Sequence, residues 1–203
     1  AERPLADDAT VRATLERAKK AECDWRRVPG GERVKVGTAF VDAMVADKAR
    51  VGELLAWQMG RPIRYGAGEV RGFEERARYM IAVAEASLAD IDPGPKEGFK
   101  RYVRREPLGV VLNLPAWNFP YMTALNAVLP AILAGNTVVM KHSSQTALVA
   151  EHFAQCFAKA GLPEGVFQAL TMSHEATARA ISSGLVDQVG FTGSTAGGRS
   201  IMA

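Results

Sequence analysis

Apolar residues recur at helical spacing throughout residues 1–90. The longest stripe runs from Val70 to Leu88, and shorter stripes before it are separated by breaks rich in glycine and proline at residues 29–31 and 60–62. This pattern predicts several amphipathic helices whose apolar faces belong to a core. We therefore expect residues 1–90 to form an N-terminal helical segment that carries no chemistry of its own.

The pattern changes after a turn-forming run from Asp90 to Pro95. Side chains alternate in character from Phe99 to Arg105, which predicts an exposed strand or an edge strand. Its arginines allow two interpretations: a patch that binds phosphate, or a surface that faces solvent or a second subunit. The second is favoured, because runs of charge usually lie on a protein surface.

From residue 108 onward, short apolar runs alternate with helical patterns. The predicted strands are Val110–Leu114, Thr137–Met140, Val166–Leu170 and Val186–Phe191. The predicted helices are Phe119–Leu133, Thr146–Lys159, Glu175–Ser183 and one that begins at Thr195. Strands that alternate with helices form right-handed βαβ units and a parallel sheet. The fold class predicted for this part of the chain is therefore α/β with an open parallel sheet.

A parallel sheet places every strand-to-helix turn at one edge, where open α/β sheets bind ligands. The turns predicted here are residues 115–118, 141–145, 171–174 and 192–195. They carry an amide, an ammonium group and several hydroxyls, and helix N-termini beside them attract anions. A phosphate-bearing ligand such as a dinucleotide fits this edge, although neither a G-x-G-x-x-G nor a G-x-x-x-x-G-K motif is present.

The first of these turns is the most distinctive. Pro115 ends the strand because it has no N–H for a ladder, and Pro120 has the backbone angle of a first helical turn. Asn118 then occupies the expected helix-cap position. Two interpretations of Asn118 stay open, a simple cap or a functional amide held at the edge of the sheet.

Composition narrows the classes of function. The chain has 203 residues, of which 48% are hydrophobic and 23% charged, as expected for a globular protein of one or two domains. A net charge of +3 is too small to indicate a nucleic-acid partner. No apolar run approaches the roughly 20 residues of a membrane span, so no membrane partner is expected.

Cysteine and histidine usage adds little chemistry. Cys23 and Cys156 lie far apart, and we predict buried thiols in a reducing, cytoplasmic compartment rather than a disulfide or a nucleophile. The histidines, His142, His152 and His174, lack the spacing of metal ligands. No metal is therefore expected.

Several segments resemble landmarks of the aldehyde dehydrogenase superfamily, in the same order and over nearly the whole chain. They are Glu106-Pro-Leu-Gly-Val-Val111, Pro115-Ala-Trp-Asn-Phe-Pro120, Leu133-Ala-Gly-Asn-Thr-Val-Val-Met-Lys141, Ala160-Gly-Leu-Pro-Glu-Gly-Val166 and Phe191-Thr-Gly-Ser-Thr195. The resemblance implies a Rossmann-like dinucleotide-binding part over residues 108–203 with an incomplete parallel sheet. It also implies that residues 91–107 are a β-hairpin that serves as an oligomerisation strand.

The resemblance also implies roles for individual residues. Asn118 matches the amide that stabilises the oxyanion of a thiohemiacetal, and Lys141 matches a lysine that binds the adenosine ribose. Gly193 and Ser194 match a turn that admits the pyrophosphate to a helix N-terminus. The remaining cofactor-binding positions implied are Leu114, Pro115, Ala116, Trp117, Ser143 and Ser144. The positions implied to line the substrate tunnel are Phe119 and Met122.

The function implied by the resemblance is oxidation of an aldehyde to a carboxylic acid, with hydride transfer to NAD or NADP, in a homodimer or homotetramer. Ser144 stands where an acidic residue often binds the ribose hydroxyls, so NADP is expected to serve at least as well as NAD. The loop at residues 171–175 lacks the family's glycines, so the resemblance does not predict which residues contact the adenine.

The family's glutamate base and nucleophilic cysteine lie further along than Ala203. The chain is therefore expected to be a truncated, coenzyme-binding part that is inactive alone. The alternative is a non-catalytic module that binds nucleotide or pairs with a subunit. An unrelated nucleotide-binding α/β domain is disfavoured by the order of the motifs.

Overall fold

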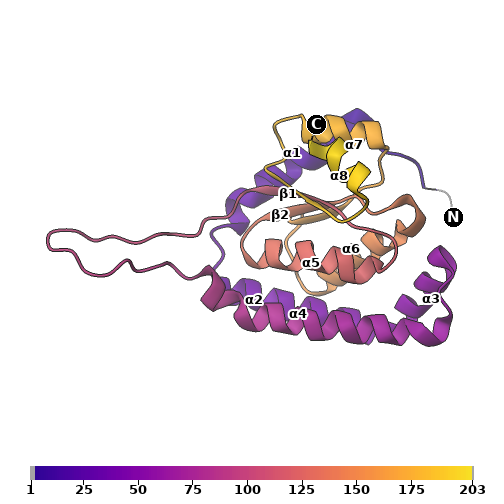
Figure 1. Cartoon of the computed structure of the whole chain (residues 1–203), viewed down its shortest axis with the longest axis horizontal. Coiled ribbons are helices and arrows are strands. Elements are labelled where there is room, and N and C mark those ends of the chain that lie inside the picture. Colours follow the sequence, from indigo (N-terminus) through magenta and orange to yellow (C-terminus); the bar gives the residue numbers. More distant parts are fainter. Residues whose placement is uncertain (1–2, 203) are drawn as a thin grey trace.

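A computed structural model describes residues 3–202 and contains a parallel sheet with helices on both faces (Figure 1). The four strands are β1 (Val110–Leu114), β2 (Thr137–Met140), β3 (Phe167–Ala169) and β4 (Gln188–Phe191). Their order is β3-β2-β1-β4, so that the first two strands in sequence lie at the centre. The predicted α/β class with an open parallel sheet is therefore confirmed.

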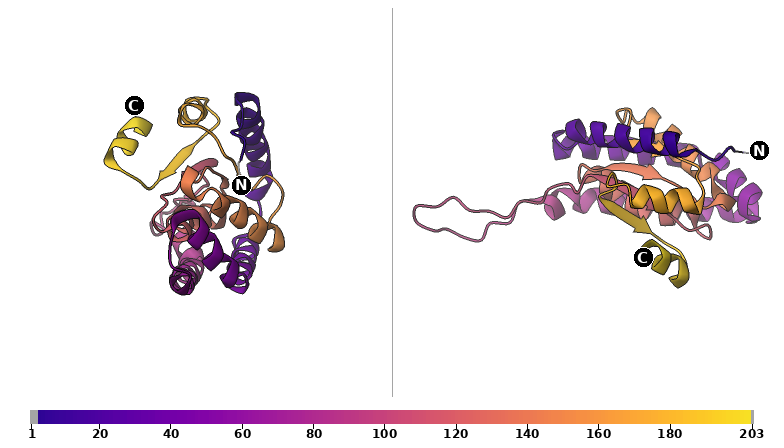
Figure 2. Two further views of the ribbon diagram at one scale, coloured as in Figure 1. Left: turned by 90° about the vertical axis from the view of Figure 1, so that its right-hand side faces the viewer. Right: turned by 90° about the horizontal axis from the view of Figure 1, so that it is seen from above.

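The helices are α1 (Asp8–Trp25), α2 (Gly30–Ala46), α3 (Lys48–Met59), α4 (Gly66–Leu88), α5 (Pro120–Leu133), α6 (Leu148–Lys159), α7 (His174–Ile181) and α8 (Thr195–Met202). Short 3-10 turns span Ile63–Tyr65 and Ser144–Thr146. Helices α1 and α7 cover one face of the sheet, whereas α5 and α6, backed by α2 and α4, cover the other (Figure 2). None of the described helices is both long and apolar enough to cross a membrane.

The two central strands are buried on both faces, as expected when helices cover both sides of a parallel sheet. Val111 and Val138 point into a large core shared with α5 and α6, while Leu112 and Val139 point into a smaller core under α1 and α7. The larger core is rich in aromatic rings, and Phe40 stacks on Phe157 at a centroid distance of 3.8 Å. The predicted apolar stripes of the N-terminal segment thus belong to the core.

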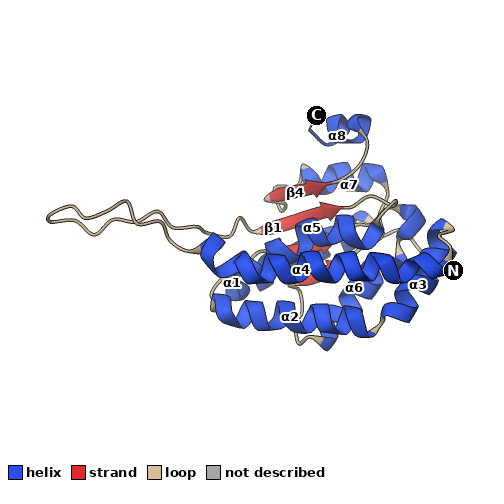
Figure 3. Ribbon diagram, turned by 60° about the horizontal axis from the view of Figure 1, so that its bottom comes forward, coloured by secondary structure: helices blue, strands red, loops and turns tan. Residues whose placement is uncertain are grey.

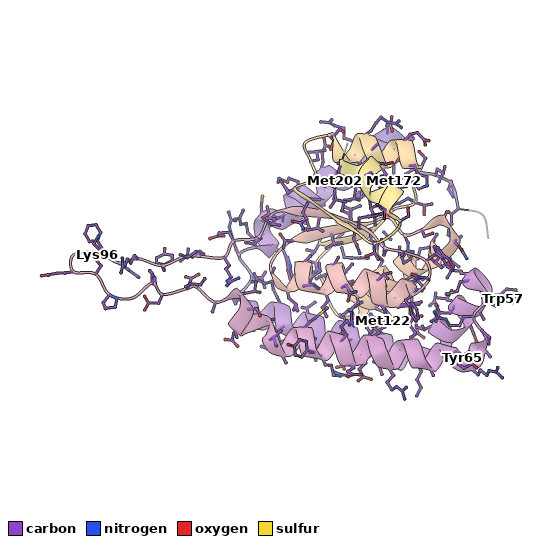
Figure 4. All side chains as sticks on the ribbon, viewed as in Figure 1. Trp57, Tyr65, Lys96, Met122, Met172 and Met202 are labelled. Carbon is purple, nitrogen blue, oxygen red and sulfur yellow. The ribbon has the colours of Figure 1, made fainter. Side chains whose placement is uncertain are left out.

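The predicted strand over residues 99–105 does not form. Residues 90–105 instead extend from the body as a long hairpin, with Lys96 near its tip (Figure 4). Its backbone pairs at two isolated bridges, Ile91 with Val103 and Lys96 with Phe99, and the Arg101 side chain also donates to the Gly94 carbonyl at 3.1 Å. Phe99 is 68% exposed, so no packing supports a ladder, and an isolated two-stranded ribbon is marginally stable in water.

Smaller differences concern the ends of elements. The apolar run at 108–114 includes Leu108, but Leu108 is exposed and β1 begins at Val110. The predicted helix at 146–159 opens as a 3-10 turn before α6 begins at Leu148. Strand β4, which forms the edge of the sheet opposite β3, is only partly buried, and α8 lies beyond it (Figure 3).

Candidate functional site

The turn between β1 and α5 presents the Asn118 amide. Pro120 is the first residue of α5, and the helix cap is Phe119, so the interpretation of Asn118 as the cap is wrong. The Asn118 Oδ1 atom accepts a hydrogen bond from the Phe119 N–H at 3.1 Å. The Nδ2 group has no hydrogen-bond partner among residues 3–202. Two N–H donors of this exposed amide are therefore available to a ligand.

The same turn is held from both sides. Thr123 Oγ1 donates to the Ala116 carbonyl at 3.0 Å from within α5. Arg61 Nη2, from the link after α3, donates to the Asn118 carbonyl at 2.8 Å. Fixed carbonyls on either side of the amide restrict the positions that the Asn118 side chain can reach.

The strand-to-helix turns enclose a cleft of about 740 Å³, which we call the first cleft. All ten residues implied at this edge lie along it: Leu114, Pro115, Ala116, Trp117, Asn118, Lys141, Ser143, Ser144, Gly193 and Ser194. No carboxylate of the described residues lines it. The first cleft therefore combines one cationic group with hydroxyl and amide groups and suits an anionic ligand.

Lys141 supplies the positive charge of the first cleft. It directly follows β2, and its N–H donates to the Asn113 carbonyl at 3.0 Å, which fixes its backbone against β1. Burial lowers the pKa of its ammonium group, since the charged form loses hydration. No described residue forms an ion pair with Lys141. An anion bound here would supply the missing charge partner.

His142 fastens the loop that carries Lys141. Its Nε2–H donates to the Pro120 carbonyl at 3.2 Å, and its Nδ1 accepts from the Thr146 hydroxyl at 2.9 Å. Burial lowers the pKa of His142 to about 4, so the ring is neutral at neutral pH and keeps one donor and one acceptor. His142 thereby joins the loop after β2 to the first turn of α5. The sequence, which showed only that the histidines lack the spacing of metal ligands, gave no indication of this role.

The turn between β4 and α8 is packed on an aromatic ring. A Cβ atom on Gly193 would collide with the Phe191 ring, and one on Gly197 would come within 2.9 Å of it. Ser194 Oγ accepts from the Gly197 N–H at 3.1 Å and caps α8. The glycines allow the backbone of this turn to lie close to Phe191, which itself lines the first cleft.

A second cleft, of about 630 Å³, lies on the other side of the Asn118 turn. Phe119 and Met122 both line it, together with Met59, Arg61, Pro62, Tyr65, Gly68, Glu69 and Gly72. Figure 4 places Met122 between α5 and α4, with Tyr65 at the N-terminal end of α4. The five residues from Leu114 to Asn118 thus face one cleft, while Phe119 faces the other.

Comparison with known proteins agrees with this geometry. The model of the aldehyde dehydrogenase family matches residues 1–203. The chain belongs to the aldehyde dehydrogenase family. A succinate-semialdehyde dehydrogenase [NADP(+)] from Mycobacterium avium is 32% identical over 201 residues, which are 98% of this chain and 43% of that protein. A peroxisomal aminoaldehyde dehydrogenase from Malus domestica is 33% identical over 208 residues, covering 98% of this chain and 41% of that one.

Solved structures of aldehyde dehydrogenases share the fold. The succinic semialdehyde dehydrogenase of Streptococcus pyogenes, in complex with NADP+, superimposes with a TM-score of 0.92 at 27% identity, over 100% of this chain and 44% of that one. The NADP-dependent glyceraldehyde-3-phosphate dehydrogenase of Bacillus halodurans, complexed with NADP, gives 0.89 at 30% identity, over 98% and 43% of the two chains. The chain thus spans less than half the length of these relatives.

Part of the wall of the first cleft is formed by residues that the sequence did not predict. Residues of α7 and α8 also line the first cleft, among them His174, Thr177, Ile181, Ser200 and Ile201. The spacing of Thr177 and Ile181 marks one helical face, but nothing in the sequence tells which face meets the ligand edge. The loop after β3 ends at Ser173, whose Oγ atom accepts a hydrogen bond from the Ala176 N–H at 3.1 Å and caps α7.

The two cysteines are free thiols outside both clefts. Cys156 is buried as expected, and burial raises its pKa to about 11. Cys23 is exposed, so the prediction of a buried thiol is wrong there; it lies on the outer side of α1. Within residues 3–202 no group of three histidine, cysteine or acidic side chains is arranged to hold a metal ion.

Proposed function

We propose that this chain supplies the coenzyme-binding part of an NADP-dependent aldehyde dehydrogenase, which oxidises an aldehyde to a carboxylic acid. The observation that carries the proposal is the first cleft, where Lys141 meets the turn hydroxyls with neither an ion-pair partner nor a lining carboxylate among residues 3–202. NADP, when bound, would accept a hydride from the substrate. The names of the relatives in Mycobacterium avium and Bacillus halodurans both specify NADP dependence.

The preference for NADP follows from charge. NADP differs from NAD by a phosphate on the adenosine ribose, close to where Lys141 and Ser144 would bind it. A carboxylate at position 144 would repel this phosphate, whereas a serine offers a hydroxyl donor. Lys141 then pairs with the phosphate as a point charge. Charge-assisted hydrogen bonds of this kind are stronger than neutral ones, so we expect NADP to bind at least as well as NAD.

Other residues of the first cleft would hold the rest of the cofactor. Gly193 and Ser194 would admit the pyrophosphate to the N-terminus of α8, where backbone N–H groups and the helix dipole favour negative charge. Leu114 to Trp117 would line the groove with backbone and apolar side chains. The α7 residues His174 and Thr177 would then stand beside the adenosine end.

Asn118 would act on the substrate. Asn118 lines the first cleft and the next residue, Phe119, lines the second, so the Nδ2 donors would face an aldehyde bound near the nicotinamide. A fixed amide donor that meets the negative charge developing on the carbonyl oxygen stabilises the transition state by about 3 kcal/mol. Replacing Asn118 with alanine in the complete enzyme is therefore expected to lower kcat by roughly 10²-fold, with cofactor affinity nearly unchanged. A normal kcat with reduced stability would mean that Asn118 is only structural.

The chain alone is proposed to be inactive. Neither Cys23 nor Cys156 lines a cleft, and the raised pKa of Cys156 disfavours its thiolate. The proposal therefore assigns the role of the family's thiolate nucleophile to neither of these cysteines.

The second cleft, with its largely apolar wall at Phe119 and Met122, would receive the aldehyde chain.

The proposal is tested with the 203-residue protein by isothermal titration with NADP and by an aldehyde-dependent assay of NADP reduction. We expect NADP to bind and no reduction to occur. Failure to bind NADP would contradict the proposed function. Reduction that survives alkylation of Cys23 and Cys156 would contradict the inactivity of the chain alone.

We further propose that the enzyme is a homo-oligomer built through the hairpin. Phe99, Tyr102 and Val103 expose apolar surface on an arm that touches little of its own chain. Apolar side chains exposed together on one segment mark protein interaction sites. Sedimentation of the parent and of a Phe99→Ser, Tyr102→Ser variant tests this proposal. The variant should form a smaller oligomer than the parent.

A further inference from the structure

A buried ion pair lies beneath the turn that carries Asn118. Arg61 follows α3 in the link to the next 3-10 turn, and Glu69 is in the first turn of α4. The side chain of Glu69 is 0% exposed and that of Arg61 only 14%. Burial raises the pKa of the Glu69 carboxyl, while Arg61 and nearby backbone N–H groups oppose that rise. Charges this deeply buried are retained only where they are paired and hydrogen-bonded.

Glu69 takes the place of a missing helix cap on α5. The cap residue, Phe119, offers no side-chain oxygen to the free N–H groups of the first turn. Glu69 Oε1 accepts a hydrogen bond from the Tyr121 N–H at 3.0 Å instead, from a position 52 residues earlier in the chain. A carboxylate at a helix N-terminus also interacts favourably with the helix dipole. The start of α5 is therefore fixed by α4.

Arg61 extends the same contact to Asn118 itself. One nitrogen of its guanidinium pairs with Glu69, while Nη2 donates to the Asn118 carbonyl at 2.8 Å. The guanidinium carbon also lies 4.7 Å from the centroid of the Phe119 ring. A planar fork can meet these partners together, which an ammonium group cannot. The pair thus contacts Asn118, Phe119 and Tyr121, on both sides of Pro120.

We propose that Arg61 and Glu69 are positioning residues that hold Asn118 in the orientation required for catalysis. This inference rests on the proposed function, in which Asn118 Nδ2 meets the reacting carbonyl oxygen. The pair fixes the backbone on one side of that amide, opposite the bond from Thr123 to Ala116. A displacement of about 1 Å at a reacting centre can cost roughly 10²-fold in rate, so loss of this clamp should be seen in kcat.

The test uses Arg61→Lys in the complete enzyme that contains this chain. Lysine keeps a positive charge for Glu69 but cannot also donate to the Asn118 carbonyl with the same geometry. We expect kcat to fall about tenfold or more, with the KM for NADP within about twofold of the parent. Arg78→Lys is the matched control, because Arg78 pairs with Asp42 and Glu74 at the surface, away from both clefts. It should leave kcat unchanged.

The decisive measurement repeats Arg61→Lys in an Asn118→Ala background. If Arg61 acts through Asn118, its substitution should then change kcat less than about twofold, as expected for strongly coupled residues. Should Arg61→Lys not fold, Glu69→Gln takes its place, since it keeps an acceptor for Tyr121. Equal losses of kcat in both backgrounds, or no loss in the parent, would contradict the positioning role. A parent enzyme without NADP-dependent aldehyde oxidation would contradict the proposed function instead.

Discussion

Two basic residues on opposite sides of the Asn118 turn differ in how their charges are met. Arg61 is partly buried, lines the second cleft and is paired with Glu69, with a backbone carbonyl and with an aromatic ring. Lys141 is half-buried in the first cleft and pairs with no described residue, although burial lowers its pKa. The environment of Arg61 is that of a charge that stabilises the fold, and the environment of Lys141 is that of a charge that binds a ligand. A charged side chain in a cleft that lacks an ion-pair partner is therefore a better indication of a ligand site than a charged side chain that has one.

The largest expected effect on folding stability comes from removing the partner of a buried charge. Arg61→Met leaves the Glu69 carboxylate buried without its counter-ion, which typically costs about 3–5 kcal/mol of folding free energy. The exposed pair at Arg78 should cost less than about 1 kcal/mol when Arg78→Met removes it. Denaturant unfolding of both variants at neutral pH provides the measurement. Equal losses would mean that Arg61 is not a structural charge.

A second effect concerns His142, which joins the Lys141 loop to α5. Its pKa is about 4 in the folded chain and about 6.5 when unfolded, so the unfolded state binds more protons between these values. Folding stability from this group is therefore complete above about pH 6.5 and falls as the pH drops toward 4. The shift of about 2.5 pH units corresponds to roughly 3 kcal/mol.

Denaturant unfolding from pH 7 to pH 4 measures this loss. His142→Gln keeps a donor and an acceptor but does not titrate, so the stability advantage of the parent over this variant should shrink as the pH falls. A pH-independent difference between the two proteins would show that His142 is not buried in its neutral form.

The smallest effect on stability should come from Lys141. Lys141→Ala removes an unpaired, half-buried charge, so the free energy of unfolding should stay the same or rise slightly. NADP affinity should fall about tenfold or more, or about 1.4 kcal/mol, because a phosphate loses its counter-charge. Titration calorimetry and unfolding of the same sample compare both quantities. If Lys141→Ala lowered the free energy of unfolding without weakening NADP binding, Lys141 would stabilise the fold and would not bind the cofactor.

The sequence was sufficient for features set by local pattern. Buried runs such as Val110–Leu114 and Thr137–Met140 have the observed ends, because each is followed by a proline or by polar residues. The convergence of the turns at one edge then follows from parallel topology, and it brings Asn118, Lys141 and Gly193 to one cleft. These inferences need only the period of the pattern and the handedness of βαβ units.

What the sequence could not predict depends on distant contacts. The cap of α5 comes from Glu69 on α4, and no local rule links a helix start to a carboxylate 52 residues earlier. The faces of α7 and α8 that line the first cleft depend on how those helices pack. The alternation from Phe99 to Arg105 predicts a strand, yet a strand also needs a neighbour, and the hairpin has little of its own chain beside it.

Titration of the 203-residue protein with NADP and with NAD measures whether the first cleft binds NADP through Lys141 and Ser144. The parent and Ser144→Glu are compared in the same buffer. We expect the parent to bind NADP at least as tightly as NAD, and Ser144→Glu to weaken NADP binding by about tenfold or more while NAD binding is kept, since a carboxylate there repels the phosphate. A strong preference of the parent for NAD that the substitution leaves unchanged would contradict the account.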